Sequence, residues 1–269
     1  MNIVRRNLLP VSVSFLFLIP IFWMLFVSIK IEGTAIDSVK DWVLPPYSMD
    51  AYKSILTGSP ILTWMFNSFF VAAVTTLLTL IVTSLAAFVF ARMSFPYKNS
   101  IYYMILAGLM IPGEATIIPL YQVAKDIGIL DSYLGLILPS IAGPLGVIIL
   151  RSFFEQVPDE IIESAKMDGC GTLRIYWNII LPLAKPALAA IGIFTFIGSW
   201  NNFLWPFLAV TSEYLYTLPI GIPTLISNYS VDYVRPMVIN SISSIPAIIA
   251  FLIFQKQIIR GISFTGMKG

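Results

Sequence analysis

The stretch Phe66–Ala91, FNSFFVAAVTTLLTLIVTSLAAFVFA, contains no aspartate, glutamate, lysine or arginine. A helix needs roughly 20 apolar residues to cross about 30 Å of hydrocarbon, so this stretch predicts a membrane-spanning helix. Four further charge-free runs have a similar length: Leu8–Ile29, Ser132–Leu150, Pro186–Ser212 and Pro236–Gln255. A weaker run, Asn99–Ala124, is interrupted by Glu114. The sequence therefore predicts an all-α membrane protein with six transmembrane helices.

The composition excludes several classes of protein. Hydrophobic residues make up 58% and charged residues 11% of the chain, and the mean hydropathy is +0.86, whereas soluble domains carry about 25% charge. No histidine is present, which excludes imidazole metal sites and histidine acid–base catalysis. Cys170 is the only cysteine, so no intrachain disulfide can form. No G-x-x-x-x-G-K-[ST] motif occurs, so any nucleotide that drives this protein must bind to another polypeptide.

The distribution of lysine and arginine predicts that both termini are cytoplasmic. With that orientation five basic residues lie outside and the remaining eleven of the sixteen lie inside; the outside residues are Lys30, Lys40, Lys53, Lys125 and Arg235. Arg5-Arg6 before an apolar run also suits a secretory signal. The run is longer than a typical signal core, and Ile29-Lys30-Ile31-Glu32 is no small-residue cleavage site, so we interpret it as an uncleaved anchor.

These signals divide the chain into segments. We predict a cytoplasmic N-terminus at 1–7, a first transmembrane helix at 8–29, an external segment at 30–65, a five-span core at 66–255 that includes an inside loop at 152–182, and a cytoplasmic tail at 256–269. The span at 66–91 is rich in Ala, Ser and Thr, which lets helices approach closely in lipid, so we expect it at the centre of the bundle. The prolines and glycines of the fourth span indicate either a distorted helix or a mobile gate.

The inside loop predicts a short helix that begins at Pro158. Proline suits the first helical position, and the acidic residues that follow it favour the positive end of the helix dipole. We expect Ile161, Ile162 and Ala165 on one apolar face, and positive φ angles at Gly169 and Gly171 where the helix ends. A helix of roughly eleven residues spans only about 16 Å and is marginal alone in water, so it needs a docking partner.

A second amphipathic helix is predicted over Leu173–Ile180. Leu181-Pro182 and Pro186 then bend the chain into the fifth span. Two interpretations stay open at this point. The loop is either a lever that moves the fifth span or an ordinary structured membrane loop with common helix caps.

The string Glu163-x-Ala165-x-x-Asp168-Gly169, followed by Ile179-x-Leu181-Pro182, resembles the coupling motif of permease subunits of type-1 ABC importers. Ser164 and Cys170 replace alanines of the family pattern, and both are small. Further segments are similar to oligosaccharide permeases of the maltose type: Ile118–Tyr121, Gly128–Pro139, Ser199–Pro206 and Gly266–Gly269.

The resemblance implies a complex. It contains a companion permease, two ATPase subunits that bind ATP and Mg²⁺, and an extracytoplasmic sugar-binding protein. This chain would be a transport subunit rather than an enzyme, with no cofactor of its own. The ATPase-coupling residues would be Pro158, Ile161, Ile162, Glu163, Ala165, Asp168, Gly169, Leu181 and Pro182, and the tail that reaches the ATPases would be Gly266, Met267, Lys268 and Gly269.

Candidate residues for the substrate pathway are Trp200, Asn201, Asn202 and Glu114. Amides and indole faces suit sugar hydroxyls and pyranose rings, although interfacial anchoring explains the same residues. Glu114 is the only acid within a predicted span and should face water or the outer interface.

Two other classes of function remain as alternatives. An ion-coupled secondary transporter acting alone usually carries several intramembrane carboxylates or histidines. A membrane enzyme would need a nucleophile–base pair or a metal cluster, and the sequence shows neither.

Overall fold

The computed structural model describes residues 2–226 and 232–266, which are helical with no β-strand among them. The elements, with η1 and η3 as 3₁₀-helices and η2 as a π-helix, are α1 (Asn2–Ser28), α2 (Val39–Val43), α3 (Asp50–Gly58), α4 (Ile61–Arg92), α5 (Lys98–Gly108), α6 (Gly113–Asp126), α7 (Tyr133–Ile137), η1 (Leu138–Ser140), α8 (Pro144–Glu155), α9 (Asp159–Met167), α10 (Thr172–Ile175), η2 (Tyr176–Ile180), α11 (Leu181–Leu183), α12 (Lys185–Trp200), α13 (Leu204–Ala209), η3 (Glu213–Leu215), α14 (Leu218–Leu225) and α15 (Val234–Gly266). The predicted all-helical class is confirmed.

The long helix α4 lies at the centre of the bundle, as its small residues predicted. It packs mainly on α8 and α12 and also contacts α3, α7 and α14. The packing is close: a Cβ added to Gly146 of α8 would lie 3.1 Å from a methyl of Thr83, and one added to Gly192 of α12 would lie 3.3 Å from Leu80. Glycine and threonine thus let two helices approach α4 more closely than larger residues would allow.

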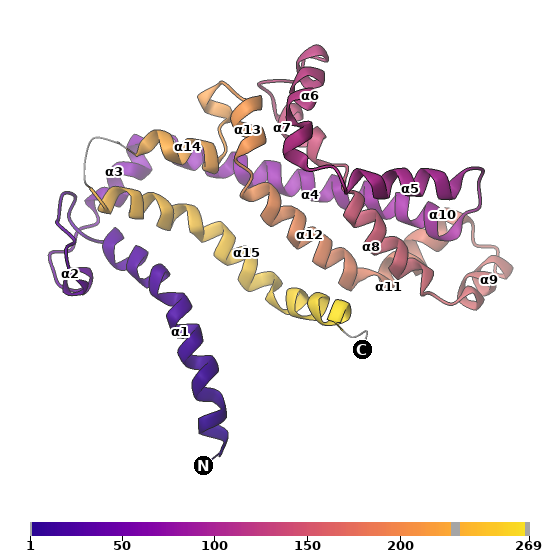
Figure 1. Cartoon of the computed structure of the whole chain (residues 1–269), viewed down its shortest axis with the longest axis horizontal. Coiled ribbons are helices and arrows are strands. Elements are labelled where there is room, and N and C mark those ends of the chain that lie inside the picture. The colour runs from indigo at the N-terminus through magenta and orange to yellow at the C-terminus, as the bar shows by residue number, and fades with distance from the viewer. Residues whose placement is uncertain (1, 227–231, 267–269) are drawn as a thin grey trace.

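The bundle is elongated, and α4 runs along it (Figure 1). We call the end that carries α9 and α10 the α9 end, and the opposite end, with α3 and α14, the α14 end (Figure 1). Helix α1 packs chiefly on α15 and diverges from the other helices toward its N-terminus (Figure 1). Many apolar side chains of α1 are exposed, including Phe15, Leu16 and Phe17.

Only α4 is by itself long and apolar enough, among the described residues, to cross a membrane. The described residues contain up to four membrane-crossing elements if each bent pair of helices is one span. The pairs are α5 with α6, bent by 104°, α7 and η1 with α8, bent by 46°, and α10–α11 with α12, bent by 78°. Ser12–Ser28 and Val234–Ile249 are shorter apolar helices. The count of six spans therefore stays a prediction, as does the orientation of the termini.

One expected boundary is wrong. The fifth apolar run, Pro186–Ser212, is not one helix, because α12 ends at Trp200 and a separate short helix, α13, follows. The Asn201 side-chain amide donates to the Ile197 carbonyl at 2.9 Å, and Pro206 has no N–H with which to continue a helix. The predicted second helix of the inside loop is present, and its last part, Tyr176–Ile180, is the π-helix η2.

Candidate functional site

The helix α9 presents its two sides to different surroundings. Ile162 and Ala165, three residues apart and therefore on one face, are 8% and 7% exposed and belong to the apolar core of the α9 end. Ile161 is 43% exposed and lies at the edge of that face. The predicted single face of three residues is therefore wrong for Ile161: two of the three pack inside this chain, and Ile161 is left at the surface.

The outward side of α9 is formed by residues near the opposite of the buried face. At 100° per residue these are Glu160, Glu163 and Met167, and all three are exposed, Met167 at 88%. Leu173 of α10 is exposed at 69%. A partner that contacts this loop would therefore meet apolar side chains interspersed with carboxylates.

The start of α9 differs slightly from expectation. Pro158 is the N-cap residue, with φ −57° and ψ 138°, rather than the first helical residue. Asp159 and Glu160 occupy the first turn as predicted, where carboxylates favour the helix dipole.

The end of α9 is a Schellman motif, and this geometry explains the Ala-x-x-Asp-Gly spacing. The Cys170 amide donates to the Ala165 carbonyl and the Gly169 amide to the Lys166 carbonyl, both at 2.9 Å. Gly169 has φ +77°, as predicted, and Asp168 is the exposed C-cap residue. Ala165 and Cys170 pack in the same core, which is the apolar contact that accompanies this motif. The expectation for Gly171 is wrong, because its φ is −70° and it serves as the N-cap of α10.

The Leu181-Pro182 pair lies at a change of helix type. Pro182 has no N–H to give to the Asn178 carbonyl, and its ring would press on that carbonyl in a regular α-helix. The preceding residues, Tyr176–Ile180, adopt a π-helix, in which the Leu181 amide donates to the Tyr176 carbonyl. A bend of 78° then separates α10–α11 from α12. The bend predicted from the prolines is thus present.

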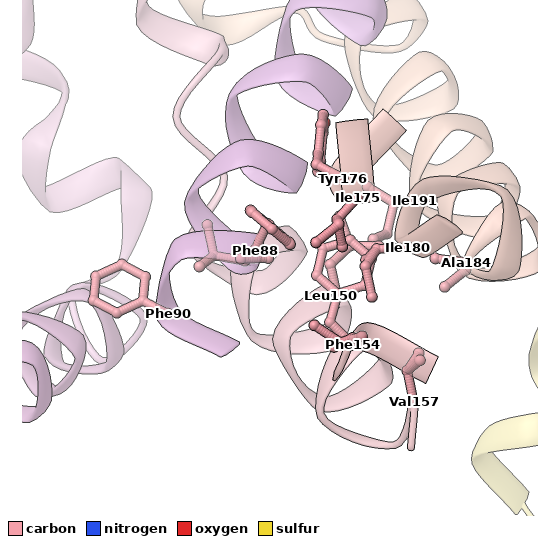
Figure 2. Packing of buried hydrophobic residues seen from close by; sticks show 14 of the residues in the cluster. Phe88, Phe90, Leu150, Phe154, Val157, Ile175, Tyr176, Ile180, Ala184 and Ile191 are labelled. Atoms are coloured by element: carbon pink, nitrogen blue, oxygen red, sulfur yellow. The ribbon is translucent and has the colours of Figure 1, made fainter. Parts of the chain in front are cut away.

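Tyr176 attaches the second half of the loop to α4. The side chain is 1% exposed, and its hydroxyl shares a buried hydrogen bond of 2.7 Å with Ser84 of α4. Its ring lies 5.2 Å from that of Phe88. Figure 2 shows Ile175, Tyr176 and Ile180 converging with side chains of α4 and α8 on a single cluster. The loop is therefore folded onto the bundle and does not hang free.

Arg92, the last residue of α4, attaches the first half of the loop. Its Nη1 donates to the Asp159 carboxylate at 2.6 Å, and its Nη2 donates to the carbonyls of Phe154 and Val157. Sequence reasoning counted Arg92 only as an inside charge. Its position at the end of a long apolar run was the available signal, but nothing in the sequence identified its acceptors 62 to 67 residues away.

The predicted pathway residues differ in their surroundings. Trp200 is 6% exposed, and its ring is stacked on that of Phe196 at 6.1 Å. Asn201 is exposed and bonded to its own helix, whereas Asn202 is half-buried. Glu114 is exposed in the first turn of α6, directly after the 104° break. A role in substrate passage stays a prediction for all four residues.

The predicted tail that reaches the ATPases lies mostly outside the described residues. Gly266 is the last described residue of α15, and Met267, Lys268 and Gly269 lie outside the described residues. Within residues 2–226 and 232–266 no group of three or more cysteine or acidic residues is placed to hold a metal ion.

An apolar helical bundle around α4, with a short polar helix held at one end, is the architecture of a membrane transport subunit. The chain belongs to the family of binding-protein-dependent transport system inner membrane components, whose sequence profile matches residues 80–264. This finding confirms the family inferred from the loop motif.

Individual relatives agree. The chain is 36% identical over 269 residues to the arabinooligosaccharides transport system permease protein AraQ of Bacillus subtilis strain 168, covering 99% of this chain and 96% of that protein. It is 32% identical over 256 residues to the sn-glycerol-3-phosphate transport system permease protein UgpE of Yersinia enterocolitica, covering 92% and 91%. The fold is similar, with a TM-score of 0.83, 25% identity and 95% coverage of both chains, to a crystal structure of a bacterial ABC transporter involved in the import of the acidic polysaccharide alginate.

Proposed function

We propose that this chain is one of two permeases in an ATP-driven importer of a sugar or oligosaccharide, and that it couples to separate ATPase subunits through residues 158–171. The named relatives that span nearly the whole chain support the importer class and the carbohydrate class of substrate. The companion permease, the two ATPases with their ATP and Mg²⁺, and the extracytoplasmic sugar-binding protein are part of the proposal. So are six spans in a bacterial cell membrane and cytoplasmic termini.

One observation carries the coupling role. The helix α9 is only nine residues long, with one face in the core of this chain. Ile161 at the edge of that face and Met167 on the outward side are exposed beside acidic residues. A short helix of this kind gains little from its own hydrogen bonds, so its position depends on what contacts it. A partner that grips the exposed side would control the position of α9, and the buried side would pass that displacement into the bundle.

The docking test uses charge at the exposed apolar residues. Ile161→Asp and Met167→Asp should each reduce co-purification of the ATPase subunits about tenfold, because a carboxylate would be desolvated in the contact. Asn99→Asp adds the same charge at an exposed position in the first turn of α5 and should leave co-purification unchanged. If Met167→Asp releases the ATPases and Ile161→Asp does not, the contact is centred on the outward side of α9.

Reconstitution distinguishes the importer from an ion-coupled secondary transporter. Uptake into proteoliposomes should require the ATPase subunits, ATP and the binding protein. Uptake by the purified chain alone under an ion gradient would overturn the proposal.

A further inference from the structure

Arg92 connects α4 to the end of α8, to the link that follows and to the start of α9. Among the described ion pairs, only that of Arg92 connects α4 to these segments. Its acceptors are Phe154 near the end of α8, Val157 in the link, and Asp159 at the start of α9. The arginine side chain is 11% exposed, so its bonds to the two carbonyls are largely shielded from water. One guanidinium thus ties the end of the central helix to the point where α8 becomes α9.

The two carbonyl bonds matter more than the ion pair. The Asp159 side chain is 80% exposed, and exposed ion pairs contribute little because water and salt screen them. The Phe154 carbonyl lies in the last turn of α8, at the negative end of the helix dipole, so a cation bonded to it is favourable, while the Val157 carbonyl lies in the link beyond that helix. A guanidinium presents five N–H donors in a planar fork that reaches acceptors on separate segments, whereas an ammonium presents three donors around a single nitrogen.

This attachment defines a route from α9 that differs from the Leu181-Pro182 bend. The bend leads to α12 through a π-helix and a change of direction of 78°. Arg92 leads directly to α4, which packs on α8 and α12 and extends to α14 at the opposite end. We propose that Arg92 is a positioning residue that makes the end of α4, the end of α8 and α9 move as one body, so that displacement of α9 is delivered to the central helix. The inference rests on the proposed coupling of α9 to ATPase subunits.

The test measures sugar imported per ATP hydrolysed in proteoliposomes that contain both permeases, the ATPases and the binding protein. This ratio does not change when only the amount of folded protein falls, so it separates positioning from stability. Arg92→Ala should lower the ratio at least about fivefold, which is the lower end of typical couplings between sites. Arg92→Lys, which keeps the charge but not the fork, should give an intermediate ratio, and Asp159→Asn should stay near wild type.

Lys98→Ala is the matched control. Lys98 is a cation at the start of α5, and its Nζ donates at 2.9 Å to the carbonyl of Met93, the residue that follows α4. Its removal should leave the ratio unchanged. If Arg92→Ala is too poorly inserted to assay, Arg92→Lys decides the question by the same ratio.

The outcomes separate the two levels of the proposal. A wild-type ratio in Arg92→Ala or, where that variant cannot be assayed, in Arg92→Lys overturns the role of Arg92. A loss in Asp159→Asn as large as in Arg92→Ala overturns the role of the two carbonyl bonds, because the exposed ion pair would then be the active contact. If the wild-type chain transports without any ATPase, the proposed function itself fails, whatever the variants show.

Discussion

The α9 end and the turn at Asp131 are both held by one ionised side chain that makes several hydrogen bonds to distant segments. Arg92 donates to residues 154, 157 and 159. The Asp131 carboxylate accepts from the amides of Thr211 and Ser212, each at 2.9 Å, and from the Ser212 hydroxyl. We call each of these sets of hydrogen bonds a clasp. The two clasps are chemically opposite, because Arg92 is a cation that donates to carbonyls and Asp131 is an anion that accepts from amides.

The surroundings of the two clasps differ. Next to Asp131 the polar contacts continue: Tyr133 donates its hydroxyl proton to Asn67 at 2.6 Å, and Asn67 donates to the carbonyls of Tyr214 and Tyr216. The Trp205 indole donates to the Gly135 carbonyl at 2.8 Å. At the α9 end the described side-chain hydrogen bonds from the loop to α4 are those of Arg92 and Tyr176, and apolar side chains remain exposed.

This difference indicates where the chain can move. A region joined by many side-chain hydrogen bonds between distant segments opens only with much of the fold. A short helix with one side exposed is displaced at lower cost, even though its other side packs on the core of the α9 end. The Asp131 turn is therefore expected to act as a fixed brace between α6, α7 and the segment after α13. The α9 end is expected to respond to a partner.

The largest expected effect is at the brace. A Cβ on Gly135 would lie 2.2 Å from the Ile129 carbonyl oxygen, a backbone atom that cannot turn away. Gly135→Ala should cost about 3 kcal/mol, the upper range for overpacking, measured as a lower midpoint of thermal unfolding in detergent. Gly198→Ala in α12 is the control, because no atom lies within 4 Å of its added Cβ. An unchanged midpoint in Gly135→Ala would show that the turn is not tightly packed.

A smaller and more local effect is expected at the α9 end. Gly169→Val places a β-branched residue at φ +77°, which costs of order 1–3 kcal/mol. The strain should disturb the end of α9 and lower sugar uptake per ATP severalfold, while the unfolding midpoint of the bundle changes little. Gly171→Ala, at φ −70° with open space around it, should behave as wild type. Equal uptake ratios in the two variants would refute the role of the left-handed turn.

Much of the fold was predictable because lipid imposes simple rules. Long charge-free runs must be helical, and small residues mark a helix that others approach, so the central place of α4 followed from its composition. The breaks at Pro112-Gly113 and Gly143-Pro144 were also visible, but their angles of 104° and 46° were not. Such angles depend on packing between helices, which no local pattern encodes.

The candidate site was predictable only in its local part. The bonding at the end of α9 follows from a glycine at the correct spacing, because Schellman geometry involves neighbouring residues alone. The partition of Ile161 and Ile162 between surface and core was not predictable, since both are apolar and adjacent. Arg92 and the pairing of Tyr176 with Ser84 were missed because their partners are 62 to 92 residues away.

The smallest effect provides a pH test of the Asp131 brace. The hydrogen bond from the Ser212 hydroxyl, followed by those from the Ser212 and Thr211 amides, lowers the pKa of the Asp131 carboxyl below its ordinary value of 3.8. A carboxyl whose folded pKa is depressed contributes stability above its unfolded pKa and loses that contribution as the pH falls through the folded value. The contribution should therefore be complete at neutral pH and decline below about pH 3.8.

Asp131→Asn removes the titrating group while keeping its size. The unfolding midpoint of the wild type should exceed that of Asp131→Asn at pH 7, and the difference should shrink below about pH 4 as Asp131 is protonated. Asp37→Asn is the control, since the Asp37 carboxylate is exposed and lies outside this clasp. A difference that persists unchanged at low pH would show that the charge of Asp131 does not stabilise the turn, since asparagine adopts the positive φ of 53° as readily as aspartate.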